Sequence, residues 1–367
     1  GVNISGNITD GVISGGATGN GSGVDISGNS TLTNTTVSGN GTDGSGVNIS
    51  GNLTGDAGST VTGNASGNGT GVDINGTVTG GDITGNASGN GNGVNISGNI
   101  TDGVISGGAT GNGSGVDISG NSTLTNTTVN GNGTDGSGVN ISGNLTGDAG
   151  STVTGNASGN GSGVNISGNI TDGVISGGAT GNGSGVDISG NSTLTNTTVS
   201  GNGTDGSGVN ISGNLTGDAG STVTGNASGN GNGVNISGNI TDGVISGGAV
   251  NGNGVEYTGP SKLTNTTVSG TSVNGNDVKE YSQDAIQQHA RSTQAALAEL
   301  RAEGSQVTET SGYRPETRTL TISVCDEEHS CSRNTVSSAG GDVQPPYSHP
   351  RVVATPMTSG SEKNVNP

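Results

Sequence analysis

The sequence predicts an all-β fold: a single-stranded, right-handed parallel β-helix (a β-solenoid) of about 12 coils, with a small C-terminal helix and a tail. Two observations support this prediction. The tetrapeptide Gly-Val-(Asn/Asp)-Ile recurs about every 22 to 25 residues, and Val94, Val164 and Val234 open near-identical copies 70 residues apart. Between these sites, Gly-Asn pairs supply residues that tolerate tight corners. Repeats of this length are typical of stacked supersecondary units.

The apolar residues of each coil alternate with polar ones, as strands require. The Val and Ile of each tetrapeptide flank one polar residue, so they should face inward while residues such as Asn3 and Asn48 face outward. Further apolar sites at Leu32 and Val37 predict a second and a third strand in each coil, and residues 1–276 therefore form the solenoid region. The expected core ladder comprises Val2, Ile4, Val24, Ile26, Val47, Ile49, Val94, Ile96, Val164, Ile166, Val234 and Ile236.

The composition explains why such a chain must stack thin layers. Hydrophobic residues are 25% and aromatic residues 1% of the chain, whereas Gly contributes 79 residues. A globular domain normally has about 45–50% apolar residues. Hydrogen bonds between coils and stacked identical side chains must therefore supply much of the stability. In the twelfth coil Tyr257 replaces the usual Ile, and we expect this larger side chain to close the final layer.

The C-terminal quarter has a different composition. Residues 277–304 predict a capping helix, which Ser282 would N-cap and which ends before Gly304; a partner-binding helix is the alternative. Residues 305–331 predict a short strand and a small disulfide loop between Cys325 and Cys331, since a lone cysteine pair is typical of exported chains. A zinc site including His329 is the weaker alternative there. Residues 332–367 are proline-rich and predict a flexible tail.

Charge excludes several classes of partner. The formal net charge is −19, and all nine Lys and Arg residues lie at Lys262 or later. Without cations the repeats cannot neutralise phosphates, so we expect no binding of nucleic acid and no docking on anionic lipid. No run approaches the ~20 apolar residues of a membrane helix, so no membrane insertion is expected. Gly1 opens within a repeat, which favours a fragment whose export signal lies upstream.

Catalytic chemistry is not indicated, and we expect no enzyme, no cofactor and no metal. The histidines, His289, His329 and His349, lie outside the repeats. A polysaccharide-cleaving β-helix enzyme would need clustered carboxylates or cations, whereas the repeats carry isolated Asp residues. A calcium site at Asp25 is disfavoured because sister coils carry Asn at the same offset.

Asn-x-Ser/Thr sequons are the most abundant motif. They arise readily in a composition so rich in Asn, Ser and Thr, but exposed sequons are also acceptors for sugars that add bulk and solubility. The candidate glycosylation sites are Asn7, Asn34, Asn52, Asn64, Asn126 and Asn265.

The Gly-Val-Asn-Ile-Ser-Gly-Asn coils and the Cys-x5-Cys segment resemble two-partner secretion exoprotein adhesins, the family of the filamentous haemagglutinin and the high-molecular-weight adhesins. The resemblance covers residues 1–331. It implies a protein exported through an outer-membrane two-partner transporter and located outside the cell or on the bacterial cell surface. It also implies adhesion to host cell-surface glycans or mucin, bridging between flagellin and host cells, and hexosylation at sequons. The 36 residues that follow Cys331 depart from family members in which a terminal cysteine loop anchors the chain.

Two other functions remain open from the sequence. The repeats could be a passive spacer or stalk. A solenoid that binds ice or another surface is suggested by Thr31-Leu-Thr33 and Thr60-Val-Thr62, although coils opening at Val2 and Val94 lack this pattern.

Overall fold

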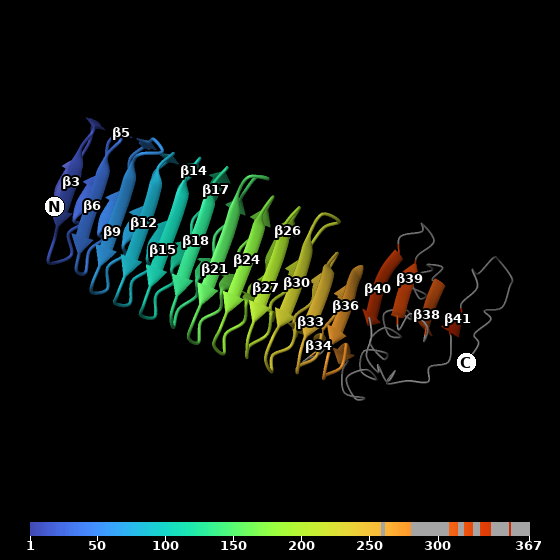
Figure 1. Cartoon of the computed structure of the whole chain (residues 1–367). Coiled ribbons are helices and arrows are strands. Elements are labelled where there is room, and N and C mark those ends of the chain that lie inside the picture. The colour runs from blue at the N-terminus through green and yellow to red at the C-terminus, as the bar shows by residue number, and fades with distance from the viewer. Residues whose placement is uncertain (258–260, 280–307, 315–318, 326–330, 339–351, 354–367) are drawn as a thin grey trace.

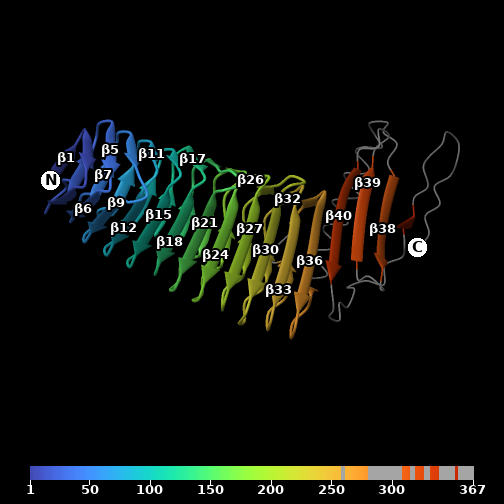
Figure 2. The ribbon, with the colours of Figure 1, turned by 45° about the horizontal axis from the view of Figure 1, so that its top comes forward.

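A computed structural model of the chain describes residues 1–257, 261–279, 308–314, 319–325, 331–338 and 352–353. Throughout these residues every regular element is a β-strand. Successive turns of the chain stack into three parallel sheets, so the fold is the expected parallel β-solenoid of about 12 turns. Figure 1 shows the strands of one sheet side by side along the rod, and Figure 2 shows the same rod turned.

The first sheet holds the Gly-Val-(Asn/Asp)-Ile tetrapeptides. In the described chain its strands are β1 (Val2–Ile4), β4 (Val24–Ile26), β7 (Val47–Ile49), β10 (Val72–Ile74), β13 (Val94–Ile96), β16 (Val116–Ile118), β19 (Val139–Ile141), β22 (Val164–Ile166), β25 (Val186–Ile188), β28 (Val209–Ile211), β31 (Val234–Ile236), β34 (Val255–Tyr257) and β37 (Val278–Lys279).

The second sheet holds the shortest strands. In the same order along the rod they are β2 (Asn7–Thr9), β5 (Ser30–Thr33), β8 (Leu53–Gly55), β11 (Val78–Thr79), β14 (Ile100–Thr101), β17 (Ser122–Thr125), β20 (Leu145–Thr146), β23 (Ile170–Thr171), β26 (Ser192–Thr195), β29 (Leu215–Thr216), β32 (Ile240–Thr241) and β35 (Leu263–Thr264).

The third sheet holds the longest strands. Its coil strands are β3 (Val12–Gly16), β6 (Thr36–Gly41), β9 (Thr60–Ala65), β12 (Asp82–Ala87), β15 (Val104–Ala109), β18 (Thr128–Gly133), β21 (Thr152–Ala157), β24 (Val174–Ala179), β27 (Thr198–Gly203), β30 (Thr222–Ala227), β33 (Val244–Ala249) and β36 (Thr266–Ser272). Four C-terminal strands continue this sheet in the order β40 (Cys331–Ser338), β39 (Thr319–Cys325), β38 (Thr308–Arg314) and β41 (Val352–Val353).

The predicted core ladder is confirmed. Equivalent residues pair in register from coil to coil, for example Val24 with Val47 and Ile26 with Ile49. Every ladder residue is buried except Val2, which is partly buried in the first coil. The outward positions also agree: Asn3 is exposed and Asn48 is half-buried. The inward columns therefore form one continuous thin core along the rod.

One register shift recurs in the second sheet. Strand β5 pairs with β2 through Leu32 and Ile8, but it pairs with β8 through Ser30 and Leu53. The same two-residue shift recurs between β17 and β20 and between β26 and β29. It places Ser30, and its counterparts Ser122 and Ser192, in buried positions facing the core.

The end of the rod differs from the expected closure by Tyr257. Tyr257 is buried and pairs with Ile236, but β37 adds a further rung to the first sheet and β40 pairs with β36 in the third. The unpaired backbone groups of the twelfth coil explain this, because an open edge accepts further strands. The short strand expected within 305–331 is present as β39. Strand β40 extends into the segment expected as the tail. The helix expected over 277–304 is wrong at its start, because Val278 and Lys279 pair with β34 as β37; residues 280–304 lie outside the described residues.

Candidate functional site

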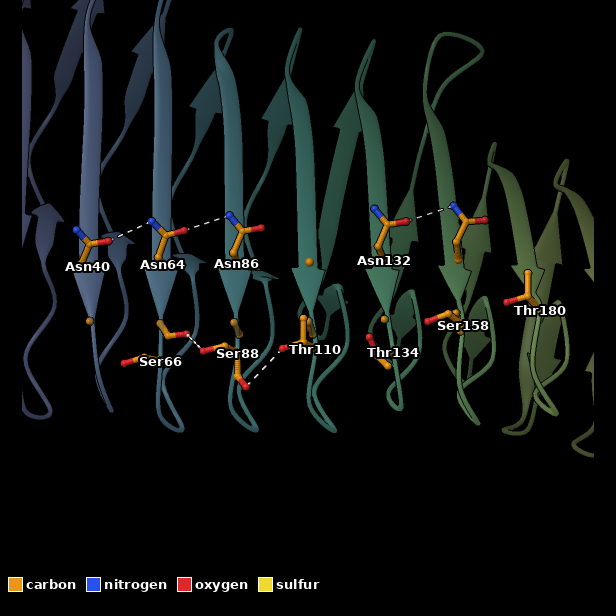
Figure 3. Close-up of a pocket in the computed structure, with 18 residues that line it drawn as sticks. Asn40, Asn64, Ser66, Asn86, Ser88, Thr110, Asn132, Thr134, Ser158 and Thr180 are labelled. Carbon is orange, nitrogen blue, oxygen red and sulfur yellow. Dashed lines mark hydrogen bonds between the residues drawn. The ribbon is translucent and has the colours of Figure 1, made fainter.

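A groove runs along the rod where the strands of the third sheet end, and it crosses the coils from β6 to β24 (Figure 3). Its volume is about 710 Å³. On one side lies an amide row, which comprises Asn40, Asn64, Asn86, Asn132 and Asn156. On the other side lies a hydroxyl row, which comprises Ser66, Ser88, Thr110, Thr134, Ser158 and Thr180. The two rows give the groove a repeated polar lining.

The alternation of the third strand builds this groove. In β12, Asn86 is exposed and the next residue, Ala87, turns inward and is buried, so that Ser88 returns to the surface. The inward position carries only Ala or Gly in the coils that line the groove. These small side chains leave the space between the two rows unfilled. A larger apolar side chain would not fit at this corner.

Hydrogen bonds fix the amide row along the rod axis. Asn64 Nδ2 donates to Asn40 Oδ1 at 3.1 Å, and Asn86 Nδ2 donates to Asn64 Oδ1 at 3.1 Å. Asn156 Nδ2 donates to Asn132 Oδ1 at a longer 3.5 Å. All three bonds run in the same direction, so the row has one polarity. The hydroxyl row is held less tightly, since Ser88 Oγ donates to the Ala65 carbonyl at 3.4 Å.

The groove itself carries no titratable side chain. Carboxylates lie instead on the outer face of the first sheet, where each Asp has Asn as its neighbour in the adjoining coils. Asn140 Nδ2 donates to Asp117 Oδ1 at 2.8 Å, and Asn210 Nδ2 donates to Asp187 Oδ1 at 3.0 Å. Burial raises the pKa of Asp117 and Asp187, because desolvation outweighs the hydrogen bond from the neighbouring amide.

Other carboxylates sit at the corner between the second and third sheets. Ser151 Oγ donates to Asp148 Oδ1 at 2.6 Å, and the backbone amide of Asn126 donates to the same carboxylate. These hydrogen bonds hold the pKa of Asp148 below its usual value. Near the end of the rod, burial opposes ionisation of Glu256, but hydrogen bonds from Lys279, Asn253 and Asn232 together lower its pKa.

An uncharged groove with donors and acceptors at every rung can hold an uncharged, polar, extended ligand. It offers neither a nucleophile with a base nor a pair of carboxylates. Within the described part of the chain, no three His, Cys, Asp or Glu residues are grouped so that they could hold a metal ion. Asp25, the residue weighed for calcium, accepts a hydrogen bond from Asn48 Nδ2 at 3.2 Å.

The candidate glycosylation sites all lie at or near the surface. Asn7, Asn34, Asn52, Asn126 and Asn265 are exposed, and Asn64 is half-buried within the groove. Asn34, Asn126 and Asn265 share a corner position with positive φ. Their Nδ2 atoms donate to Asp10, Asp102 and Asp242 at 2.7, 2.7 and 2.6 Å.

Two further sequon residues, Asn52 and Asn64, take part in amide ladders. Asn52 donates to Asn29 at 3.0 Å, as Asn64 does to Asn40. A carboxamide nitrogen carries two hydrogens, so one hydrogen stays available for modification while the other keeps the ladder bond.

The two cysteines are backbone register partners in an antiparallel strand pair. Cys325, the last residue of β39, is the register partner of Cys331, the first residue of β40. Residues directly opposite in an antiparallel pair have Cα atoms roughly 4.5–5.5 Å apart, and disulfides span about 4.4–6.8 Å. The backbone register is therefore compatible with the expected disulfide.

Sequence reasoning did not find the groove. Of the amide row it named only Asn64, as a candidate glycosylation site. The recurring Gly-Asn-Ala-Ser segments contained the signal, because their alternation at the strand end sets an outward amide beside an outward hydroxyl, whereas Gly-Gly-Ala-Thr sets an outward hydroxyl alone.

Fold and site together define a class: a parallel β-solenoid rod with an uncharged polar groove along one edge. No protein-family model matches the chain, and no curated protein or solved structure does either. A search of the described residues for a helix that could cross a membrane finds none.

Proposed function

We propose that this chain is a secreted adhesin segment, a repetitive rod that attaches to host cell-surface glycans or mucin. The observation that supports it most is the groove, which repeats the same uncharged pattern of amides and hydroxyls over several stacked coils. Such a lining matches the hydroxyl groups of neutral sugars. Because the coils are near-identical, weak contacts at several of them add through avidity.

The rod acts in this proposal as a binding surface and not as an enzyme. The groove has no titratable group that could act as general acid or base, and the carboxylates of the first sheet are spaced apart by Asn residues. We assign no cofactor to this activity.

The resemblance to two-partner secretion exoproteins supports the route by which the rod reaches its target. An outer-membrane two-partner transporter would export the chain, and the coils would stack outside the cell, where it stays secreted or on the bacterial surface. Bridging to flagellin and hexosylation at sequons such as Asn34 and Asn126 belong to the same proposal. The opposed positions of Cys325 and Cys331 support a disulfide in this oxidising compartment.

The test is binding of the full chain to immobilised mucin and to host cells, compared with a variant lacking residues 94–163, one complete 70-residue copy. Deleting one copy removes three coils without changing the register, so binding should weaken while the melting temperature changes little. Loss of binding after periodate treatment of the mucin would identify sugars as the target. A rod that binds neither mucin nor cells would refute adhesion and leave the passive spacer.

The fold gives little support to the alternative of a solenoid that binds ice or another surface. Thr31 and Thr33 lie on the second sheet, whereas Thr60 and Thr62 lie on the third. The two Thr-x-Thr motifs therefore do not share a face. Thermal hysteresis of a solution of the chain, if observed, would revive this alternative.

A further inference from the structure

The amide row of the third sheet is interrupted once in each 70-residue copy. The rung between Asn86 and Asn132 is Gly108, which has no side chain. Gly178 and Gly248 occupy the same position three coils further on each time. Across the described residues, no hydrogen bond reaches Asn86 Oδ1, and none leaves Asn132 Nδ2. At Gly108 and Gly178 the interruption thus leaves one free acceptor and one free donor facing each other, whereas the rung after Gly248 is Thr271.

The backbone does not require glycine at these rungs. An added Cβ at Gly108 would meet only Asn86 Oδ1, at 3.1 Å, and at Gly178 it would meet the Asn156 carboxamide, with Oδ1 at 2.8 Å. By contrast, an added Cβ at Gly107, one residue earlier, would lie 2.0 Å from the Gly115 carbonyl oxygen. Gly107 is therefore fixed by close backbone contact, whereas Gly108 leaves a space open to the groove.

The space has the dimensions of one amide group. Coils repeat about every 4.8 Å, so the flanking Asn side chains are about 9.6 Å apart. In the uninterrupted part of the row, the Asn64 amide fills one rung with bonds of 3.1 Å on either side. An amide at the empty rung would accept from Asn132 Nδ2 and donate to Asn86 Oδ1. If every Asn carboxamide were flipped by 180°, Asn86 would offer the donor and Asn132 the acceptor, so the gap would still have one of each.

We propose that the gaps at Gly108 and Gly178 are subsites for the acetamido group of an N-acetylated sugar. A trans secondary amide has its N–H and C=O on opposite sides, so it completes the row in line. The missing side chain makes room for the methyl group, and hydroxyls such as Thr110 lie across the groove within reach of the sugar ring. The two gaps are three coils, or about 14 Å, apart. This inference rests on the proposed glycan adhesion and specifies the sugar class.

The test uses the full chain and two matched trisaccharides, tri-N-acetylchitotriose and cellotriose, which differ only by acetamido and hydroxyl groups. Saturation-transfer NMR on the unmodified chain should show binding of the N-acetylated trisaccharide, with the strongest transfer on the acetamido methyl. Two lost hydrogen bonds of ordinary strength predict at least about tenfold weaker binding of cellotriose. Equal binding of both probes, no binding of the N-acetylated one, or strongest transfer on ring protons would overturn the subsite.

A variant tests the location. Gly108→Asn/Gly178→Asn fills both gaps with the missing carboxamide, so affinity for the N-acetylated trisaccharide should fall at least about tenfold while the melting temperature holds or rises. The matched control is Ser106→Thr/Ser176→Thr, on the same strands, where sister coils carry Thr62 and Thr84. Retained affinity in the Asn variant would refute this location. Mucin binding without acetamido preference would refute the subsite but not the adhesion, whereas no binding to mucin or cells would refute the adhesion itself.

Discussion

Asn126 lies one coil after Asp102, and its Nδ2 donates a 2.7 Å hydrogen bond to the Asp102 carboxylate. Both residues have left-handed backbone, with φ of 46° for Asn126 and 53° for Asp102. Asn and Asp are the residues that best tolerate this conformation apart from Gly. The same pairing recurs at Asn34, Asn196 and Asn265. One corner of the rod therefore repeats a turn with left-handed backbone that is hydrogen-bonded to the turn of the preceding coil.

Asn126→Ala should therefore destabilise the rod by about 2–3 kcal/mol, because it loses the bond to the carboxylate and places a Cβ-bearing residue with no polar side chain at positive φ. Asn126→Gly is the control: it loses the bond but tolerates the backbone, and should cost only about 1 kcal/mol. Urea unfolding of both variants checks the order. Equal losses would mean that backbone strain at this corner is negligible.

Replacing a core residue should cost far more than replacing its neighbour on the same strand. Ile105 is 1% exposed and Val104 is 41% exposed. We expect Ile105→Ala to reduce the free energy of unfolding by about 2–5 kcal/mol, and Val104→Ala by less than about 1 kcal/mol. Chemical unfolding followed by far-UV circular dichroism measures both. Similar losses would contradict the inward assignment of this column.

Ser122→Ala should stabilise the protein. Ser122 Oγ is buried and has no hydrogen-bond partner in the described residues, so removing it relieves a desolvation cost of about 1 kcal/mol. Ser151→Ala is the control with the opposite sign, because Ser151 Oγ donates to Asp148 and accepts from the Thr127 amide. That variant should lose about 1–3 kcal/mol. A destabilised Ser122→Ala would show that its hydroxyl is bonded in solution.

Asp117→Asn should raise the melting temperature at pH 7. Burial raises the pKa of Asp117, so its ionised form is disfavoured in the folded rod and stability falls as pH rises through the folded pKa. The gain should disappear below about pH 4, where the carboxyl is protonated in both states. Melting curves from pH 3 to pH 7 measure it. A gain that does not depend on pH would point to packing instead of charge.

Asp148→Asn should behave in the opposite way. Hydrogen bonds lower the pKa of Asp148, so its contribution to stability is present above the unfolded pKa and is lost as pH falls through the folded value. The variant should be less stable than the unchanged chain at pH 7, and the difference should shrink toward pH 2. A constant difference over this range would exclude the carboxylate as its source.

Much of the fold could be predicted from the sequence because the core obeys one simple alternation. Val24 and Ile26 flank Asp25, and this pattern at regular intervals is enough to identify strands, inward columns and the coil count. The pairing beyond Tyr257 could not be predicted in this way, because residues 308–338 share no repeat with the rod, and their partners are set by an open strand edge instead of a periodic pattern.

The site was harder to predict than the fold. Gly107 and Gly108 are adjacent and look the same in the sequence, yet one is packed against a carbonyl and the other opens a space in the groove. Only the three-dimensional neighbours distinguish them. The opposed positions of Cys325 and Cys331 likewise depend on strand register, which the spacing between them suggests but does not determine.

Each 70-residue copy spans three whole coils, and this has an evolutionary consequence. The shifted pairing of Ser122 with Leu145 recurs 70 residues later at Ser192 with Leu215, so these copies begin and end on the same side of the rod. Recombination between identical copies would add or delete three rungs at once and leave every column aligned. A lineage could thus lengthen or shorten this protein in steps of about 14 Å without passing through a misfolded intermediate.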